Sequence, residues 1–411
     1  MNYRLFFLIH NEKPYKRYYS QPLVHDSVIT RILHELKGMI NRYAKVYQIS
    51  FSKQYKHHLF DASVGGGYKS GLRVFIENIA WAFKYKEVCG YYYLWGLDML
   101  NHSPKDYVAY TEFRVLRNIL NIRQRENLQT KYTFNYLALT RDKFVFGQYA
   151  NSLGFPVPAT IALITDGKLS WVDNSGAFTS IEEISKRNIS AFCKECTGEG
   201  GSGAFSLEVK DGIIKINNTK TTIEELKEKT KGAKFIVQER VQNHPAIANI
   251  YPNSVNTLRV VTVCKDNQIH LFDARLRTGA NGSVVDNACF GGVVIGINDD
   301  GTLMNWGYQE PGKSNNTNLI VKEKHPDTGF RFAGVNIPFW NEILIMTKNF
   351  HSYYYGIPSM GWDVAITPDG PVYLECGEDW EIQGTQIFKG GRRKDFYDLH
   401  GYALNIKLRK Y

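Results

Sequence analysis

The segment 361–380, GWDVAITPDGPVYLECGEDW, constrains the fold more than any other part of the chain. Two short apolar runs, 362–366 and 372–376, flank a stretch rich in Pro, Asp and Gly, so the segment predicts a β-hairpin. Each predicted strand carries one carboxylate among apolar neighbours, Asp363 on the first and Glu375 on the second. Such a carboxylate is costly unless it is paired, hydrogen-bonded or bound to a cation. Mg²⁺ is commonly held by one or two carboxylates together with substrate phosphates, so a magnesium site is one interpretation. An ordinary hairpin whose acids reach solvent is the other.

Composition limits the classes of protein that the chain can belong to. Its 411 residues, 43% of them hydrophobic, suffice for two or three folded domains. No apolar run is long enough for a membrane-spanning helix, and residues 1–10 indicate a first strand or helix rather than a secretory signal. The six scattered cysteines are typical of reduced thiols in a cytoplasmic protein. The net charge of +10 suggests an anionic partner, such as a nucleotide, a phosphorylated sugar, an acidic glycan or the inner membrane surface, although a solvated basic surface without a specific role is the commoner explanation. No recognisable nucleic-acid-binding motif is present in the sequence.

The first third of the chain, residues 1–138, is predicted to be mainly helical because 27–36 and 72–81 have apolar residues at helical spacing. A new unit is expected to begin near residue 139, where Thr140 is a candidate cap for a helix that stops before two prolines. Lys143 falls in the first turn of this helix, where a cation opposes the helix dipole. A bound phosphate would offset that cost; a plain surface lysine is the alternative.

A glycine-rich stretch, GEGGSG at 198–203, follows a predicted strand that carries Lys194. A dinucleotide-binding fold needs a helix after such glycines, but the next segment alternates like a strand. The stretch therefore predicts a hairpin whose N–H groups could fold over phosphates, with a merely flexible hairpin as the alternative.

Three arginines lie on later predicted strands. Arg259 stands among β-branched residues, and Arg275 and Arg277 share one strand face because they are two residues apart. The guanidinium fork suits phosphate or carboxylate, although ordinary surface salt bridges would also account for these residues. Upstream, Glu239 lies near the end of a strand, where a carboxylate and backbone carbonyls could meet an adenine amino group.

Taken in order, these motifs resemble the ATP-grasp superfamily, and most closely its branch associated with sugar transfer and polysaccharide biosynthesis. The resemblance covers roughly residues 139–400, from the Asp-Lys helix start through QERV, NTLR, ARLR and GWD to LEC. It implies an α+β fold in which two subdomains clasp ATP between antiparallel sheets, preceded by a mainly helical N-terminal region. The implied divisions are 1–138 for that region, 139–240 for an N-terminal subdomain with a Gly-rich lid hairpin, and 241–411 for a C-terminal subdomain with Mg-binding carboxylates.

The resemblance also implies roles for individual residues. ATP would be bound by Lys143, Lys194, Gly200, Gly201, Ser202, Gly203, Glu239 and Val241, the lysines on phosphates, the glycine-rich residues in the lid, and the last two around the adenine. Mg²⁺ would be held by Asp363 and Glu375, while the transferred phosphoryl group and an acyl phosphate would be stabilised by Arg259, Arg275 and Arg277. The family usually has Glu-x-Asn on the last strand, but the third residue here is Gly377. A further oxygen ligand would have to come from Glu378, Asp379 or water.

The implied activity is that of an ATP-dependent carboxylate–amine ligase that forms an amide through an acyl phosphate. Its expected setting is cell-surface polysaccharide biosynthesis, where it would join an amino acid or other small acid to a sugar, or amidate a uronic acid. Substrates carried on a nucleotide or a lipid, and polysaccharide-synthesis proteins as partners, are compatible with this setting. Two alternatives stay open: a kinase that phosphorylates a sugar-type hydroxyl, and a non-catalytic nucleotide-binding module.

Overall fold

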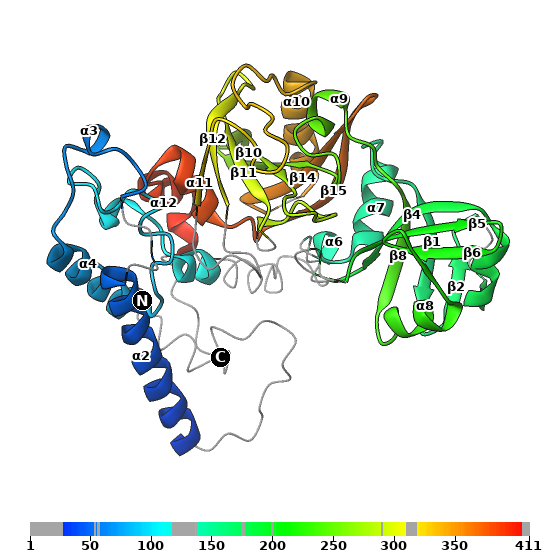
Figure 1. Ribbon diagram of the computed structural model, residues 1–411, viewed down its shortest axis with the longest axis horizontal. Helices are drawn as coiled ribbons and strands as arrows, with labels where there is room; N and C mark the ends of the chain where they lie inside the picture. Colours follow the sequence, from blue (N-terminus) through cyan, green and yellow to red (C-terminus); the bar gives the residue numbers. More distant parts are fainter. Residues whose placement is uncertain are drawn as a thin grey trace. The chain divides into compact units, whose positions relative to one another are not determined.

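The computed structural model describes residues 28–52, 55, 58–116, 136, 138–173, 177–198, 201, 203–288, 291–309, 319–354 and 356–404. The chain divides into two units, described separately below (Figure 1). The first comprises Met1–Glu126, Asn316–Leu319 and Glu381–Tyr411, and the second Asn127–Asn315 and Ile320–Trp380. This division differs from the one suggested by the sequence, which kept 241–411 together. The expectations for residues 1–10, Gly200 and Ser202 lie outside the described residues.

The described part of the first unit is helical. Its elements are α2 (Val28–Phe51), α3 (Ala62–Gly65), α4 (Gly71–Tyr85), η1 (Pro104–Asp106), α11 (Ile382–Lys389) and α12 (Arg393–Leu404). Helix α4 begins where the Ser70 side chain accepts a hydrogen bond from the N–H of Arg73, and it ends at Lys86 in the left-handed conformation. The predicted helical character of this region is confirmed. In the described residues, no helix has the length and apolar content that crossing a membrane requires.

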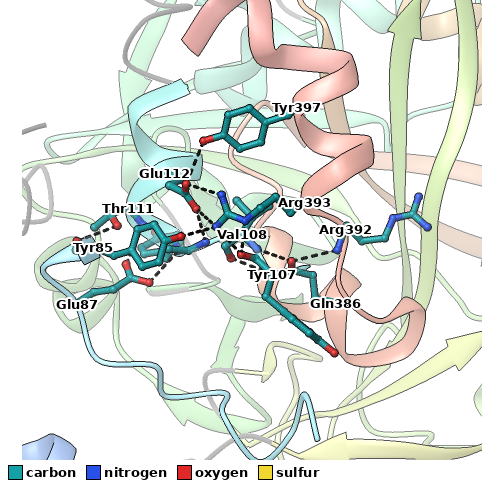
Figure 2. Close-up of polar contacts among 12 residues, drawn as sticks. Tyr85, Glu87, Tyr107, Val108, Thr111, Glu112, Gln386, Arg392, Arg393 and Tyr397 are labelled. Carbon is teal, nitrogen blue, oxygen red and sulfur yellow. Dashed lines mark hydrogen bonds and ion pairs between the residues drawn. The ribbon is translucent and has the colours of Figure 1, made fainter. Parts of the chain in front are cut away.

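Polar contacts join residues 107–112 to helices α11 and α12 within this unit (Figure 2). The guanidinium of Arg393 donates to both carboxylate oxygens of Glu112, at 2.8 and 2.7 Å, and to the carbonyl oxygen of Tyr107. The side-chain amide of Gln386 accepts from the N–H of Val108 at 2.7 Å and donates to its carbonyl oxygen at 3.1 Å. These charge-assisted and paired contacts explain why the C-terminal helices group with the N-terminal region.

An eight-stranded antiparallel sheet forms one part of the second unit, in the order β3-β2-β1-β8-β4-β5-β6-β7. Its strands are β1 (Thr160–Thr165), β2 (Lys168–Trp171), β3 (Phe178–Ser180), β4 (Ile189–Glu195), β5 (Phe205–Lys210), β6 (Ile213–Ile216), β7 (Thr219–Thr221) and β8 (Lys234–Glu239). Strands β4 and β5 pair as the hairpin that the glycine-rich stretch predicted. Helix α8 (Ile223–Lys229), which starts with a capping box between Thr222 and Glu225, and η2 (Ile181–Lys186) complete this part.

A seven-stranded sheet forms the other part, in the order β13-β12-β11-β10-β9-β14-β15. Its strands are β9 (Thr257–Lys265), β10 (Gln268–Thr278), β11 (Val293–Ile297), β12 (Leu303–Gln309), β13 (Leu319–Lys322), β14 (Ser359–Thr367) and β15 (Gly370–Gly377). Helix α10 (Trp340–Ser352) packs on one face of it, where the ring of Phe350 lies 4.9 Å from that of Trp362. The predicted hairpin at 361–380 is therefore present as β14 and β15.

Three further helices belong to the second unit: α6 (Ala138–Arg141), α7 (Lys143–Ser152) and α9 (Pro245–Ala248). The expected cap of α7 was wrong, because Thr140 lies inside α6. Asp142 caps α7 instead: its backbone is extended, and its carboxylate accepts from the N–H groups of Phe144 and Val145 at 2.8 and 3.1 Å. Lys143 is thus the first residue of the helix.

Candidate functional site

Four charged side chains form a row across the seven-stranded sheet. Glu375 of β15 lies opposite Asp363 of β14, Asp363 opposite Arg259 of β9, and Arg259 opposite Arg275 of β10. Directly opposed residues of antiparallel strands point to the same face of a sheet. Two acids and two bases therefore stand side by side on one face.

The pairing of Arg259 with Arg275 depends on a β-bulge in β10. The turn at Asp266 and Asn267, both with positive φ, pairs Lys265 with Gln268. If that register continued unchanged, Ala274 would face Arg259. The register shifts by one residue after Leu271, so that Arg275 takes the place opposite Arg259.

The pairing of Asp363 with Glu375 depends on another bulge, in β15. Val364 pairs with Tyr373, but Asp363 pairs with Glu375, so Leu374 is the extra residue. Without it, Glu375 would face Trp362 and project to the other face of the sheet, because a slip of one residue reverses every side chain. Bulges are common beside active sites for this reason.

Asp363 is the centre of the row. Its residue surface is only 4% exposed, and its Oδ1 lies 2.9 Å from Arg259 Nε while its Oδ2 lies 2.7 Å from Arg277 Nη2. Burial raises the pKa of Asp363 against the pull of Arg259 and Arg277, and the charge of Glu375 raises it further. A cation placed between the two carboxylates would remove that repulsion.

Glu375 stands at the open end of the row. Its side chain is 40% exposed, and its Oε2 lies 3.5 Å from Lys143 Nζ. Partial burial alone would raise the pKa of Glu375, but Lys143, the contact with Asp363 and the charge of Lys194 lower it to about 2. Burial lowers the pKa of Lys194, while the charge of Glu375 opposes that shift. The structure thus brings two lysines from α7 and β4 to the two carboxylates of β14 and β15.

Two residues near the row were not assigned to the site from sequence. Asp286 Oδ2 accepts a hydrogen bond from the N–H of Thr257 at 3.0 Å and another from its hydroxyl, and it lies 3.7 Å from Arg277 Nε. Burial would lower the pKa of Arg277, but Asp363 and Asp286 raise it above its usual value. In the sequence Asp286 only begins a polar turn, a signal that does not name its partners. Arg275 also has an unexpected partner, Asp273, at 2.9 Å.

The glycine-rich hairpin lies next to these groups. Lys143 Nζ donates to the carbonyl oxygen of Gly198 at 2.5 Å. Gly201 and Gly203 both have a φ of +76°, a conformation that side-chain-bearing residues rarely adopt, and a Cβ built on Gly201 would lie 3.9 Å from Val285. Glu239 ends β8 and is exposed, and Val241 is half-buried in the loop that follows.

The carboxylates suit a magnesium ion that a substrate helps to bind. Within the described residues, no group of three or more His, Cys, Asp or Glu side chains could hold a metal by itself. Mg²⁺ needs only one or two carboxylates when phosphates and waters complete its shell. Asp363 Oδ1 is buried and receives no hydrogen bond of good geometry, although Arg259 Nε lies 2.9 Å from it, so a metal ion there would share this oxygen with the guanidinium. Glu378 is in an ion pair with Arg141, and a Cβ built on Gly377 would lie 3.9 Å from the backbone N of Asp379, an ordinary contact.

Comparison with known proteins gives a family and several distant structures. No curated protein matches the sequence. The N5-carboxyaminoimidazole synthase of Aspergillus clavatus is 11% identical, covering 69% of this chain and 57% of that one with a TM-score of 0.36. D-alanyl-alanine synthetase A of Vibrio cholerae is 12% identical, covering 65% of this chain and 66% of that one with a TM-score of 0.38.

The chain spans about half the length of the first solved structures that it matches. Residues 123–394, well over half of the chain, match the family described as sugar-transfer associated ATP-grasp. The two antiparallel sheets, with a helical region at the N-terminus, agree with that fold. This protein therefore belongs to the sugar-transfer associated ATP-grasp family, as the order of its sequence motifs predicted.

Proposed function

We propose that this protein is an ATP-dependent carboxylate–amine ligase. The observation that carries the proposal is the row of Glu375, Asp363 and Arg259, faced by Lys143 and Lys194. Two carboxylates for a divalent cation beside several fixed cations suit the transfer of a γ-phosphoryl group, whose charge spreads over three oxygens. Family membership supports the same reading.

In this proposal the nucleotide lies across the second unit. Lys143 and Lys194 bind phosphate oxygens, and Glu239 and Val241 frame the adenine. Asp363 and Glu375 hold Mg²⁺, which when bound neutralises charge on the phosphates. The 139–240 segment supplies the lid-bearing subdomain, and the strands that follow supply the carboxylates.

The arginines and the glycine-rich hairpin act on the intermediate. Arg259 and Arg277 stabilise the transferred group and the acyl phosphate, and Arg275, held by Asp273, supports Arg259 from the next strand. The hairpin that contains Gly200, Gly201, Ser202 and Gly203 closes over the phosphates. Closure excludes water, which would otherwise hydrolyse the acyl phosphate before an amine attacks.

The acceptor chemistry of this proposal is suggested by the family's description as sugar-transfer associated rather than by the site. The carboxylate of an amino acid, a small acid or a uronic acid is activated, and an amine or amino sugar in surface-polysaccharide assembly receives it, with the substrates carried on a nucleotide or a lipid. Attack by the amine releases phosphate, so the products are an amide, ADP and phosphate.

The test is ATP turnover with Mg²⁺, with ADP and free phosphate assayed separately across amino acids, uronic acids and nucleotide sugars. Phosphate released in step with ADP, only when an acid and an amine are both present, is the expected result. ADP without phosphate would identify a kinase instead, and nucleotide binding without turnover on any pair would contradict the ligase. Lys194→Met should weaken nucleotide binding, whereas Lys215→Met, a half-buried lysine of the same sheet, should not.

A further inference from the structure

Helices α2 and α4 expose an unusual number of large apolar side chains. On α2, Leu36, Ile40 and Tyr47 lie four and seven residues apart, and on α4 the same spacing separates Leu72, Ile76 and Phe83. At 3.6 residues per turn, this spacing places each set on one side of its helix. We call the following residues, which are 40% to 66% exposed, the α2–α4 face: Leu36, Met39, Ile40, Tyr47, Phe51, Leu72, Ile76 and Phe83.

The two stripes meet where α2 ends and α4 begins. The ring of Phe51, at the end of α2, lies 5.2 Å from the ring of Phe75 on α4 and 5.2 Å from that of Tyr47. A Cβ built on Gly71, just before Leu72, would lie 3.7 Å from the Phe51 ring. Both helices appear in the blue part of the chain in Figure 1. Exposed apolar side chains gathered in this way mark an interaction site.

The charges around this surface are mostly positive. Among the side chains that the structure describes on helices α2 and α4, five are Lys or Arg and one is Glu. That acid, Glu77, is already paired with Lys69 at 2.8 Å and with Arg73 at 3.2 Å. Lys37 and Lys45 are exposed on α2. At the far end of the face, the ammonium of Lys86 lies 4.2 Å from the centroid of the Phe83 ring.

We propose that the α2–α4 face docks onto an anionic membrane surface. Amphipathic helices with a basic polar side lie in the plane of a bilayer, with apolar side chains among the lipid headgroups and lysines at the lipid phosphates. A second copy of the chain fits less well, because it would bring one basic rim against another. The docking needs no spanning segment, and it is independent of the proposed ligase activity.

The experiment is flotation of the full chain with vesicles of phosphatidylcholine alone, or of an equal mixture with phosphatidylglycerol. Binding to the anionic vesicles only, weakened by added salt, is the expected result. The variant Ile40→Ser/Ile76→Ser/Phe83→Ser should bind the anionic vesicles at least about tenfold more weakly, as should Lys37→Gln/Lys45→Gln. The matched control is Ile345→Ser, which removes a 70% exposed isoleucine from α10 and should leave binding unchanged.

Three results would overturn the proposal. The first is failure to bind either vesicle, and the second is equal binding to both with no effect of the lysine variant; either result contradicts docking onto an anionic surface. The third is a dimer in light scattering that the triple serine variant converts to a monomer. Because all substituted side chains are exposed, the variants should melt as the parent protein does. Their ATP turnover without vesicles should also match the parent, which separates a failure of docking from a failure of the proposed activity.

Discussion

The two faces of β9 and β14 are made from the same strands and differ in chemistry where Arg259 and Trp362 lie. Arg259 and Asp363 point to one face, while their neighbours Val260 and Trp362, also directly opposed, point to the other. The first pair belongs to the charged row, and the second lies in the hydrophobic core. The contrast indicates that one face packs against the hydrophobic core, whereas the other carries the charged row.

The core face satisfies every polar group that it buries around Trp362. The indole N–H of Trp362 donates to Thr262 Oγ1 at 2.8 Å, which leaves the hydroxyl hydrogen for His351 Nδ1, also at 2.8 Å. His351 Nε2 then donates to the carbonyl oxygen of Ile357 at 3.0 Å. The charged face instead gathers two carboxylates among arginines and lysines, and it leaves the buried atoms Asp363 Oδ1 and Arg275 Nε without a hydrogen bond of good geometry.

The largest effect on stability is expected from Trp362→Ala. The side chain is fully buried against Phe350, Tyr354 and Tyr373. Its loss removes apolar burial and leaves a cavity, so the free energy of unfolding should fall by about 3–5 kcal/mol. Urea unfolding followed by circular dichroism measures this, and a loss below about 1 kcal/mol would argue against the core assignment.

A smaller loss is expected from Thr262→Val, which keeps the side-chain shape but removes the hydroxyl. The indole N–H of Trp362 and Nδ1 of His351 would then each lack a partner in the core. Unsatisfied buried groups of this kind cost about 1–3 kcal/mol of unfolding free energy. Thr328→Val is a suitable comparison, because its hydroxyl donates to Ile250 from a part-buried position and should matter less.

A third effect appears when pH is lowered. Burial lowers the pKa of His351 to about 4, against the opposing hydrogen bond to Ile357. The unfolded chain takes up a proton near pH 6.5, before the folded chain does, so this contribution to stability is complete above pH 6.5 and is lost as pH falls toward 4. The unfolding free energy of the parent should drop by about 1 kcal/mol more than that of His351→Gln between pH 6.5 and 5.5. Parallel curves for the two proteins would show that His351 is not held neutral.

Much of this sheet could be predicted from the sequence. Alternating residues indicated the strands around Arg259, Arg275 and Asp363, and the Pro-Asp-Gly turn indicated the β14–β15 hairpin. The register could not be predicted, because the bulges at Phe272 and Leu374 have no local signal in the sequence. Those two extra residues decide that the four charges share a face.

Contacts between residues that are distant along the chain also could not be predicted from the sequence. A helical pattern does not state which surface it will cover, so the association of Arg393 with Glu112 could not be foreseen. The same holds for Asp286, whose link to Thr257 and Arg277 exists only after β9, β10 and the following turn have folded. The cap of α7 was missed for a simpler reason: Thr140 and Asp142 are both good cap residues two positions apart.

The most direct test of the central claim is the substitution Glu375→Gln, measured in two ways on the same preparation. Its side chain is 40% exposed and lies 3.5 Å from the ammonium of Lys143, so solvent screening should keep the change in the free energy of unfolding below about 1 kcal/mol. If the charged face serves ATP chemistry, Mg²⁺-dependent ATP turnover should fall at least about a hundredfold. Full turnover with an unchanged fold would contradict the account, because the charged row would then be no more than a solvated side of the sheet.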